Sequence, residues 1–139
     1  MEEAVWIAIG IVSVILGVGV IATIISHTAS QNAVQQLTNA VQALGVHCEQ
    51  VCPMTEGTAL GVTVELPADT VLFGNNDLIC GRIGDDAATL SCARCACTEA
   101  PGIILNLSGA RPFFRSYEYT CRATRIGGLA PGIQYECTG

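Results

Sequence analysis

The sequence predicts an α+β protein in which a long N-terminal helix precedes a small, disulfide-bonded all-β head. Residues before Gly45 repeat apolar side chains at helical spacing, whereas residues after Pro53 alternate apolar and polar side chains as strands do. All 8 cysteines lie in the second part of the chain. We therefore divide the chain into a helix at residues 1–46 and a head at residues 47–139.

The predicted helix begins with an apolar run from Ala4 to Ile25 that contains no charged residue. At about 1.5 Å per residue this run is roughly 33 Å long, which is enough to cross a bilayer core. It lacks the positive start, the short apolar core and the cleavage site of a secretory signal. It also lacks the flanking lysine or arginine of ordinary membrane spans. Either the protein departs from that rule, or a basic leader preceded Met1 and was removed.

The second half of the predicted helix is amphipathic. Its apolar residues recur at spacings of three and four: Ala33, Val34, Leu37, Ala40, Val41 and Leu44. No proline precedes Pro53, and Gly45 lies where a left-handed helix cap is expected, so one unbroken helix is predicted at residues 4–44. The opposite face carries glutamine and asparagine but no charge. Amides cost less than charges to remove from water, so this face suits a helix surrounded by copies of itself.

Short alternating segments bounded by turn signals predict about seven strands in the head. They are Gly61–Leu66, Thr70–Phe73, Leu78–Ile83, Thr89–Thr98, Ile103–Leu107, 116–122 and 133–137, with turns at Pro67–Asp69 and Gly74–Asp77. Such a pattern is typical of a small sandwich, including the immunoglobulin-like kind, or of a barrel. A head of this size builds only a modest core, so disulfides matter to it. We expect a cut before Cys48 to release a folded, soluble head.

An even and dense set of cysteines after a hydrophobic segment predicts disulfides in an extracytoplasmic domain. The set is Cys48, Cys52, Cys80, Cys92, Cys95, Cys97, Cys121 and Cys137. A rival interpretation takes the 48/52 and 92/95 pairs as zinc ligands, or the 92–97 cluster as part of an iron–sulfur site. Both alternatives require reduced thiols and leave four cysteines unused.

One cysteine pair is favoured by strand alternation. Cys121 and Cys137 lie on the tyrosine-bearing faces of the last two predicted strands, and a bond between them is expected to contribute about 3 kcal/mol. The other bonds are expected to involve Cys48 and Cys52, just after the predicted helix, and the cysteines in the 92–97 cluster. Which of these cysteines bonds which is not assigned.

Charge and side-chain chemistry exclude several functions. The net charge of −6 and the pI near 4.6 argue against nucleic acid or an anionic membrane surface as a partner. The two histidines lie in the helix and beside Cys48, and no catalytic constellation surrounds them. We therefore expect no enzymatic activity, no cofactor and no metal. Asn106-Leu107-Ser108 makes Asn106 a glycosylation candidate.

The whole plan resembles that of archaeal type IV pilins. The resemblance is carried by residues 4–44: an apolar and then amphipathic helix, an uncharged Gln/Asn face, and no proline. Bacterial pilins usually carry a proline where this chain reads Ile21-Ala-Thr-Ile24, and a glutamate close after the mature start, where this chain has only Glu2 and Glu3. The basic leader of the family is missing. The resemblance implies helices bundled into a filament core and heads that coat it.

The expected function is therefore that of a structural subunit in an extracellular, adhesive filament, held in the membrane before it assembles with copies of itself. The expected core-packing residues are Ile7, Gly10, Val14, Gly17, Ile21, Ile24, Val34, Leu37, Val41 and Leu44. The residues up to Ile24 would pack only on neighbouring helices. The residues from Val34 onward would pack partly on their own head and partly on neighbouring helices. The main alternative is a bitopic membrane protein with a small extracytoplasmic domain; a virion coat or a zinc module is a lesser one. The uncharged face favours the filament, because a lone anchor has no reason to avoid charge there.

Overall fold

The protein consists of one long helix followed by strands, which confirms the predicted α+β class. A computed structural model of the 139 residues describes residues 2–96, 103–107, 116–127 and 132–139. The described elements are α1 (Glu2–Val51), β1 (Ala59–Pro67), β2 (Thr70–Asn75), β3 (Leu78–Ile83), a 3-10 turn η1 (Ala87–Thr89), β4 (Ser91–Arg94), β5 (Ile103–Asn106), β6 (Ser116–Ile126) and β7 (Gly132–Thr138). Within the predicted strand at Thr89–Thr98, Thr89 belongs to η1, and β4 occupies only Ser91–Arg94. Residues 97–98 of this prediction lie outside the described residues.

Helix α1 is unbroken and extends beyond the predicted residues 4–44. Cys48 and Cys52 therefore lie at its last turn, where the amide of Cys52 donates to the carbonyl of Cys48 over 3.0 Å. Gly45 is not a left-handed cap, and the prediction of a helix end there was wrong. A Cβ atom at Gly45 would lie 2.7 Å from the Cβ of Ala93, so the missing side chain lets α1 approach β4 closely.

The chain divides by packing into two compact units, Met1–Asn32 and Ala33–Gly139. The predicted division between residues 46 and 47 was placed at an expected helix end, but α1 continues to Val51. The packing division lies earlier in the same helix, between Asn32 and Ala33. We use "head" below for residues 33–139. The last part of α1 therefore belongs to the head and has to be counted in its core.

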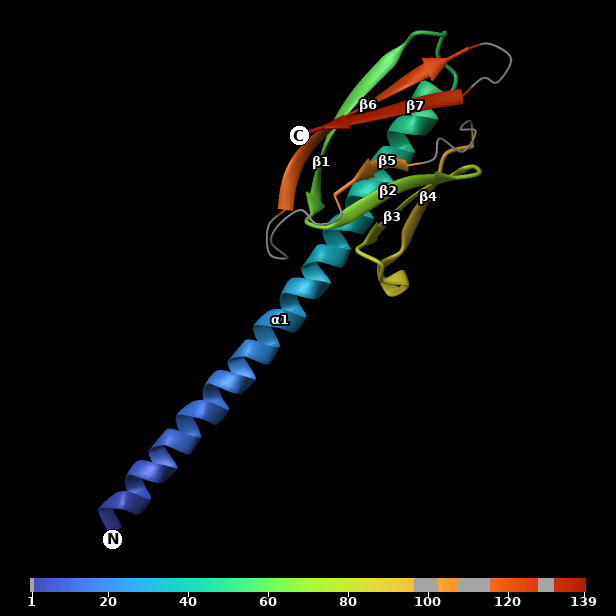
Figure 1. The fold of residues 1–139 in the computed structure, drawn as a ribbon. Coiled ribbons are helices and arrows are strands. Elements are labelled where there is room, and N and C mark those ends of the chain that lie inside the picture. The colour runs from blue at the N-terminus through green and yellow to red at the C-terminus, as the bar shows by residue number, and fades with distance from the viewer. Residues whose placement is uncertain (1, 97–102, 108–115, 128–131) are drawn as a thin grey trace. The chain divides into compact units, whose positions relative to one another are not determined.

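The strands of the head form two antiparallel sheets. One has the order β1-β6-β7 and the other β4-β3-β2-β5, so the described strands do not close into a single barrel (Figure 1). Asp69 and Asn76, at φ of 61° and 55°, make the tight turns on either side of β2, as predicted for these two segments. In the first sheet every second residue of β1 and β6 points inward, so the alternation predicted for these strands is present.

The core of the head is built around the apolar stripe of α1. Leu37, Val41 and Leu44 have no exposed surface and pack with buried side chains of both sheets, such as Leu66 and Ile79. Figure 1 shows both sheets beside this part of the helix. A Leu→Ala change at such a buried site costs about 2–5 kcal/mol.

This burial corrects two expectations from the sequence. Leu37, Val41 and Leu44 have no surface left for a neighbouring copy, so they are core residues of the head rather than of a filament; Val34 stays partly exposed. A cut before Cys48 would remove the buried stripe. We therefore no longer expect that cut to leave a folded head.

Two strand glycines provide a matched test of this helix–sheet packing. A Cβ at Gly81 of β3 would lie 2.8 Å from Leu37 Cδ1 and 3.0 Å from Val41 Cγ2, whereas one at Gly61 of β1 meets nothing within 4 Å. We expect Gly81→Val to lower the free energy of unfolding by about 1–3 kcal/mol, because the core has no room for the added atoms. Gly61→Val should change it by less than about 0.5 kcal/mol. Chemical unfolding of the detergent-solubilised chain, followed by near-ultraviolet circular dichroism, measures both; equal effects would contradict the packing.

Candidate functional site

The first unit presents an apolar helix surface that the described residues leave exposed. Every large apolar side chain from Val5 to Ile25 is more than half exposed, with Trp6 the highest at 73%. Among the expected packing residues here, Ile7, Val14, Ile21 and Ile24 are 58–65% exposed, and Gly10 and Gly17 have open space at the Cβ position. The helix is long and apolar enough to cross a membrane.

Hydroxyl groups on this surface are satisfied within the helix. Ser13 donates to the carbonyl of Ile9 over 2.8 Å and Thr23 to that of Gly19 over 2.9 Å. Ser26 and Thr28 likewise donate to carbonyls one turn earlier. Hydroxyls bonded in this way can enter lipid or a packed helix bundle without leaving an unsatisfied donor.

A row of uncharged amides follows the apolar segment along the sequence of α1. Exposed side chains along this part of α1 are Gln31, Asn32, Gln35, Asn39 and Gln42. The amide of Gln35 donates to the Oδ1 atom of Asn39 over 3.0 Å. From Ala4 to His47 the sequence contains no charged residue. We call the exposed amide row the amide face.

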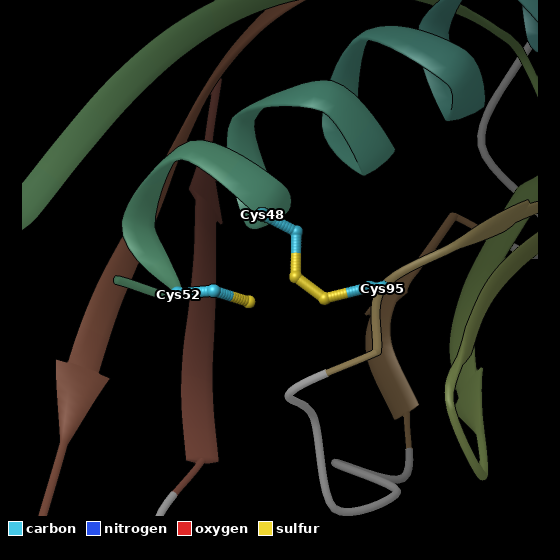
Figure 2. A group of neighbouring side chains, drawn as sticks. All are labelled: Cys48, Cys52 and Cys95. Carbon is cyan, nitrogen blue, oxygen red and sulfur yellow. A yellow bond between two sulfur atoms is a disulfide. The ribbon is translucent and has the colours of Figure 1, made fainter. Parts of the chain in front are cut away.

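At the end of α1, three cysteine sulfurs lie together (Figure 2). Cys48 bonds Cys95, which follows β4, and the sulfur of Cys52 lies within 4.8 Å of both. Every described cysteine, Cys52 included, is disulfide-bonded, which confirms the predicted disulfides; Cys97 lies outside the described residues. The Cys48–Cys95 bond closes 47 residues, for which chain entropy gives about 4 kcal/mol.

The other two described disulfides join directly opposed residues of neighbouring strands. Cys80 in β3 bonds Cys92 in β4, and Cys121 in β6 bonds Cys137 in β7. The favoured Cys121–Cys137 pair is thus present. The alternation of side chains was enough to find it, because both cysteines belong to adjacent strands.

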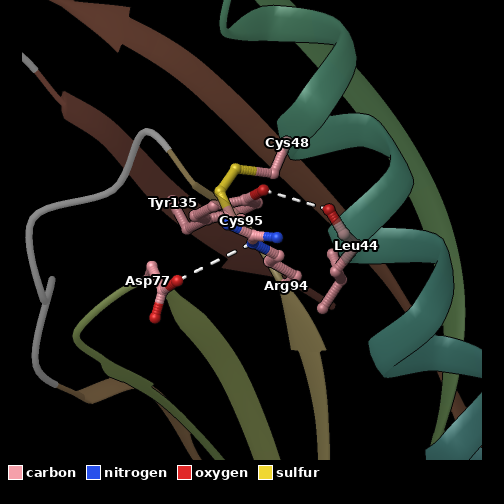
Figure 3. The surroundings of a disulfide bond; sticks show 6 residues. All are labelled: Leu44, Cys48, Asp77, Arg94, Cys95 and Tyr135. Carbon is pink, nitrogen blue, oxygen red and sulfur yellow. Dashed lines mark hydrogen bonds and ion pairs between the residues drawn. A yellow bond between two sulfur atoms is a disulfide. The ribbon is translucent and has the colours of Figure 1, made fainter.

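Tyr135 provides a second link between α1 and the sheets, which the sequence analysis missed. Its hydroxyl donates to the carbonyl of Leu44 over 3.1 Å beside the Cys48–Cys95 bond (Figure 3). The side chain is only 6% exposed, and this burial raises the pKa of Tyr135 well above its usual range. The nearby Arg94–Asp77 ion pair, at 3.8 Å, is largely exposed and contributes little.

Two remaining features, a glycosylation sequon and a groove, say less about function. Asn106 is exposed at the end of β5, and Ser108 of its sequon lies outside the described residues, so glycosylation stays a prediction. A groove of about 230 Å³ runs between α1 and β1, lined by Gln36, Asn39, Ala40, Ala43, Thr63, Val64 and Glu65. Its lining offers one carboxylate and no histidine or cysteine.

Comparison of this chain with protein-family models, with curated proteins and with solved structures finds no match.

Tyr135→Phe tests the link to the helix. Loss of the hydroxyl leaves the carbonyl of Leu44 without this donor, and we expect a cost of about 1 kcal/mol at pH 7. Tyrosine in the unfolded chain ionises near pH 10, whereas buried Tyr135 stays neutral. The native protein should therefore lose stability as the pH rises above about 10, and the variant should lose less. Urea unfolding at pH 7 and at alkaline pH measures this; parallel pH curves would contradict it.

Proposed function

We propose that this chain is a structural subunit of an extracellular, type IV pilus-like filament. In this proposal residues 4–25 of many copies bundle into the filament core, and the heads coat it. The observation that carries it is that the exposed side chains of α1 have no charge from Ala4 to Val46: they are apolar up to Ile25, and the later ones form the amide face. The resemblance of residues 4–44 to archaeal type IV pilins supports the same function.

The apolar part of the surface requires a cover. An exposed apolar surface of this length is not stable in water, so lipid or other helices must enclose it. Before assembly the membrane supplies that cover, and in the filament other copies do. Because lipid is as apolar as the helix, the exchange gains little hydrophobic energy, and close packing at small residues has to favour assembly.

The amide face separates a filament from a lone membrane anchor. An anchor that ends near Ile25 would place the following turns in water, where charged pairs stabilise an exposed helix. Amides instead tolerate removal from water, because they can hydrogen-bond to one another across helices. Gln35 and Asn39 already show such a bond along one helix.

The distribution of charge fits a solvated coat. All six arginines and ten of the twelve acidic residues lie after residue 47. In the three-stranded sheet the exposed face is polar, with Thr63, Thr120 and Thr138 in register across β1, β6 and β7. Adhesion by this coat is part of the proposal and comes from the resemblance to pilins.

The main alternative is a bitopic membrane protein with the same head in the extracytoplasmic space. It shares the membrane-spanning helix but needs no self-association. A single amide-to-acid change distinguishes the two functions.

Gln35→Glu places one charge on the amide face without changing side-chain size. We expect it to reduce filament yield more than about tenfold, because the charge would be buried between helices. Gln134→Glu, on the exposed face of β7, adds the same charge and should leave the yield unchanged. Electron microscopy of sheared cell-surface material counts filaments. Equal yields for the two variants, or no filaments from the native chain, would favour the bitopic alternative.

Gly17→Leu tests the apolar core. Gly10 and Gly17 are seven residues apart and lie on one helix face, whereas Gly19 lies on the opposite face. Leucine at Gly17 should block assembly, because its side chain occupies the space where backbones meet, while the subunit stays folded in the membrane. Gly19→Leu should assemble. Normal filaments from Gly17→Leu, or an equal loss from both variants, would contradict packing through the Gly10–Gly17 face.

A further inference from the structure

The sulfur cluster at the end of α1 has the dimensions of a metal site. The Sγ atoms of Cys48, Cys52 and Cys95 all lie within 4.8 Å of one another, and none of the three side chains is fully exposed (Figure 2). Cys48 and Cys52 are four residues apart on a helix, so their side chains share one face. A tetrahedral zinc ion with Zn–S bonds of about 2.3 Å separates its sulfur ligands by about 3.8 Å. Once the Cys48–Cys95 bond is open, rotation of the side chains can bring sulfurs that start within 4.8 Å of one another to that spacing.

Contacts other than the sulfur bonds hold the three residues in place. Cys95 donates its amide to the carbonyl of Asp77 over 2.6 Å, and Cys52 donates its own to Cys48 over 3.0 Å. The hydroxyl of Tyr135 binds α1 one turn before Cys48 (Figure 3). Close packing of Gly45 against Ala93 fixes α1 beside β4. These contacts do not involve sulfur, so they remain available to hold the three thiols together in the reduced chain.

We propose that the reduced chain binds one Zn²⁺ ion through the thiolates of Cys48, Cys52 and Cys95. Soft thiolate ligands favour a d¹⁰ ion such as zinc over calcium or magnesium. The site belongs to the chain before its disulfides form, and it does not depend on the proposed filament function. In this proposal the same cysteines are zinc ligands when reduced and form disulfides when oxidised.

The chemistry balances with a phosphine as reductant. Each disulfide takes two electrons from phosphorus and two protons from the medium, and water supplies the oxygen of the phosphine oxide. Zinc then replaces the three thiol protons, which are released to the buffer.

The test uses the full chain in detergent micelles, reduced with a water-soluble phosphine and then freed of it without oxygen. Cobalt(II) is the probe, because thiolate ligation gives charge-transfer absorption and tetrahedral geometry gives intense visible bands. We expect one equivalent of cobalt to bind and one equivalent of zinc to displace it. The double variant Cys48→Ser/Cys52→Ser should bind more than about 100-fold more weakly.

Cys80→Ser/Cys92→Ser is the matched control, because it removes two thiols from β3 and β4 and should keep its affinity. All samples are reduced, so loss of a disulfide does not distinguish the variants. Thermal unfolding of the reduced native chain should shift upward with zinc. The proposal is overturned if no charge-transfer band appears, if both double variants lose affinity equally, or if zinc leaves the unfolding temperature unchanged.

Discussion

The burial of Leu37, Val41 and Leu44 joins the last turns of α1 to both sheets of the head. It makes the last turns of α1 the central element of the head, whereas none of the residues that the structure describes covers the large apolar side chains of the first turns. One continuous helix therefore has two environments, one supplied by its own sheets and one that has to be supplied from outside. The proposed function starts from this division, because an uncovered apolar helix requires lipid or other helices to enclose it.

Covalent and polar links strengthen the same contact at the end of the helix. Cys48–Cys95 and the Tyr135–Leu44 hydrogen bond join α1 to segments far away in the sequence. In a filament, any load between the core and the coat would pass through this region. A disulfide and a well-packed stripe are suited to carry it, because neither depends on exposed charges that salt can screen.

Local pattern was enough to predict the helix, most strands and the Cys121–Cys137 bond. These features depend on neighbouring residues or on two adjacent strands, so period and alternation reveal them. Local pattern could not show that Leu37 is buried in the head or that Cys48 bonds Cys95. Both features depend on how the head folds around α1. Gly45 shows the same limit, because a glycine near a helix end and a glycine at a close helix–strand approach look alike in sequence. The candidate surface at Val5–Ile25 was predictable, because it depends only on a continuous apolar run in the sequence.

A chain that begins at Ala33 separates the two environments of α1. Residues 33–139 keep the buried stripe of α1 and lose the uncovered apolar helix. Sedimentation and circular dichroism of this chain, after oxidative folding without detergent, measure its mass and its tertiary structure. We expect a soluble, folded monomer that unfolds cooperatively. An unfolded chain, or a folded chain that still polymerises, would contradict the division of the helix between its own head and its neighbours.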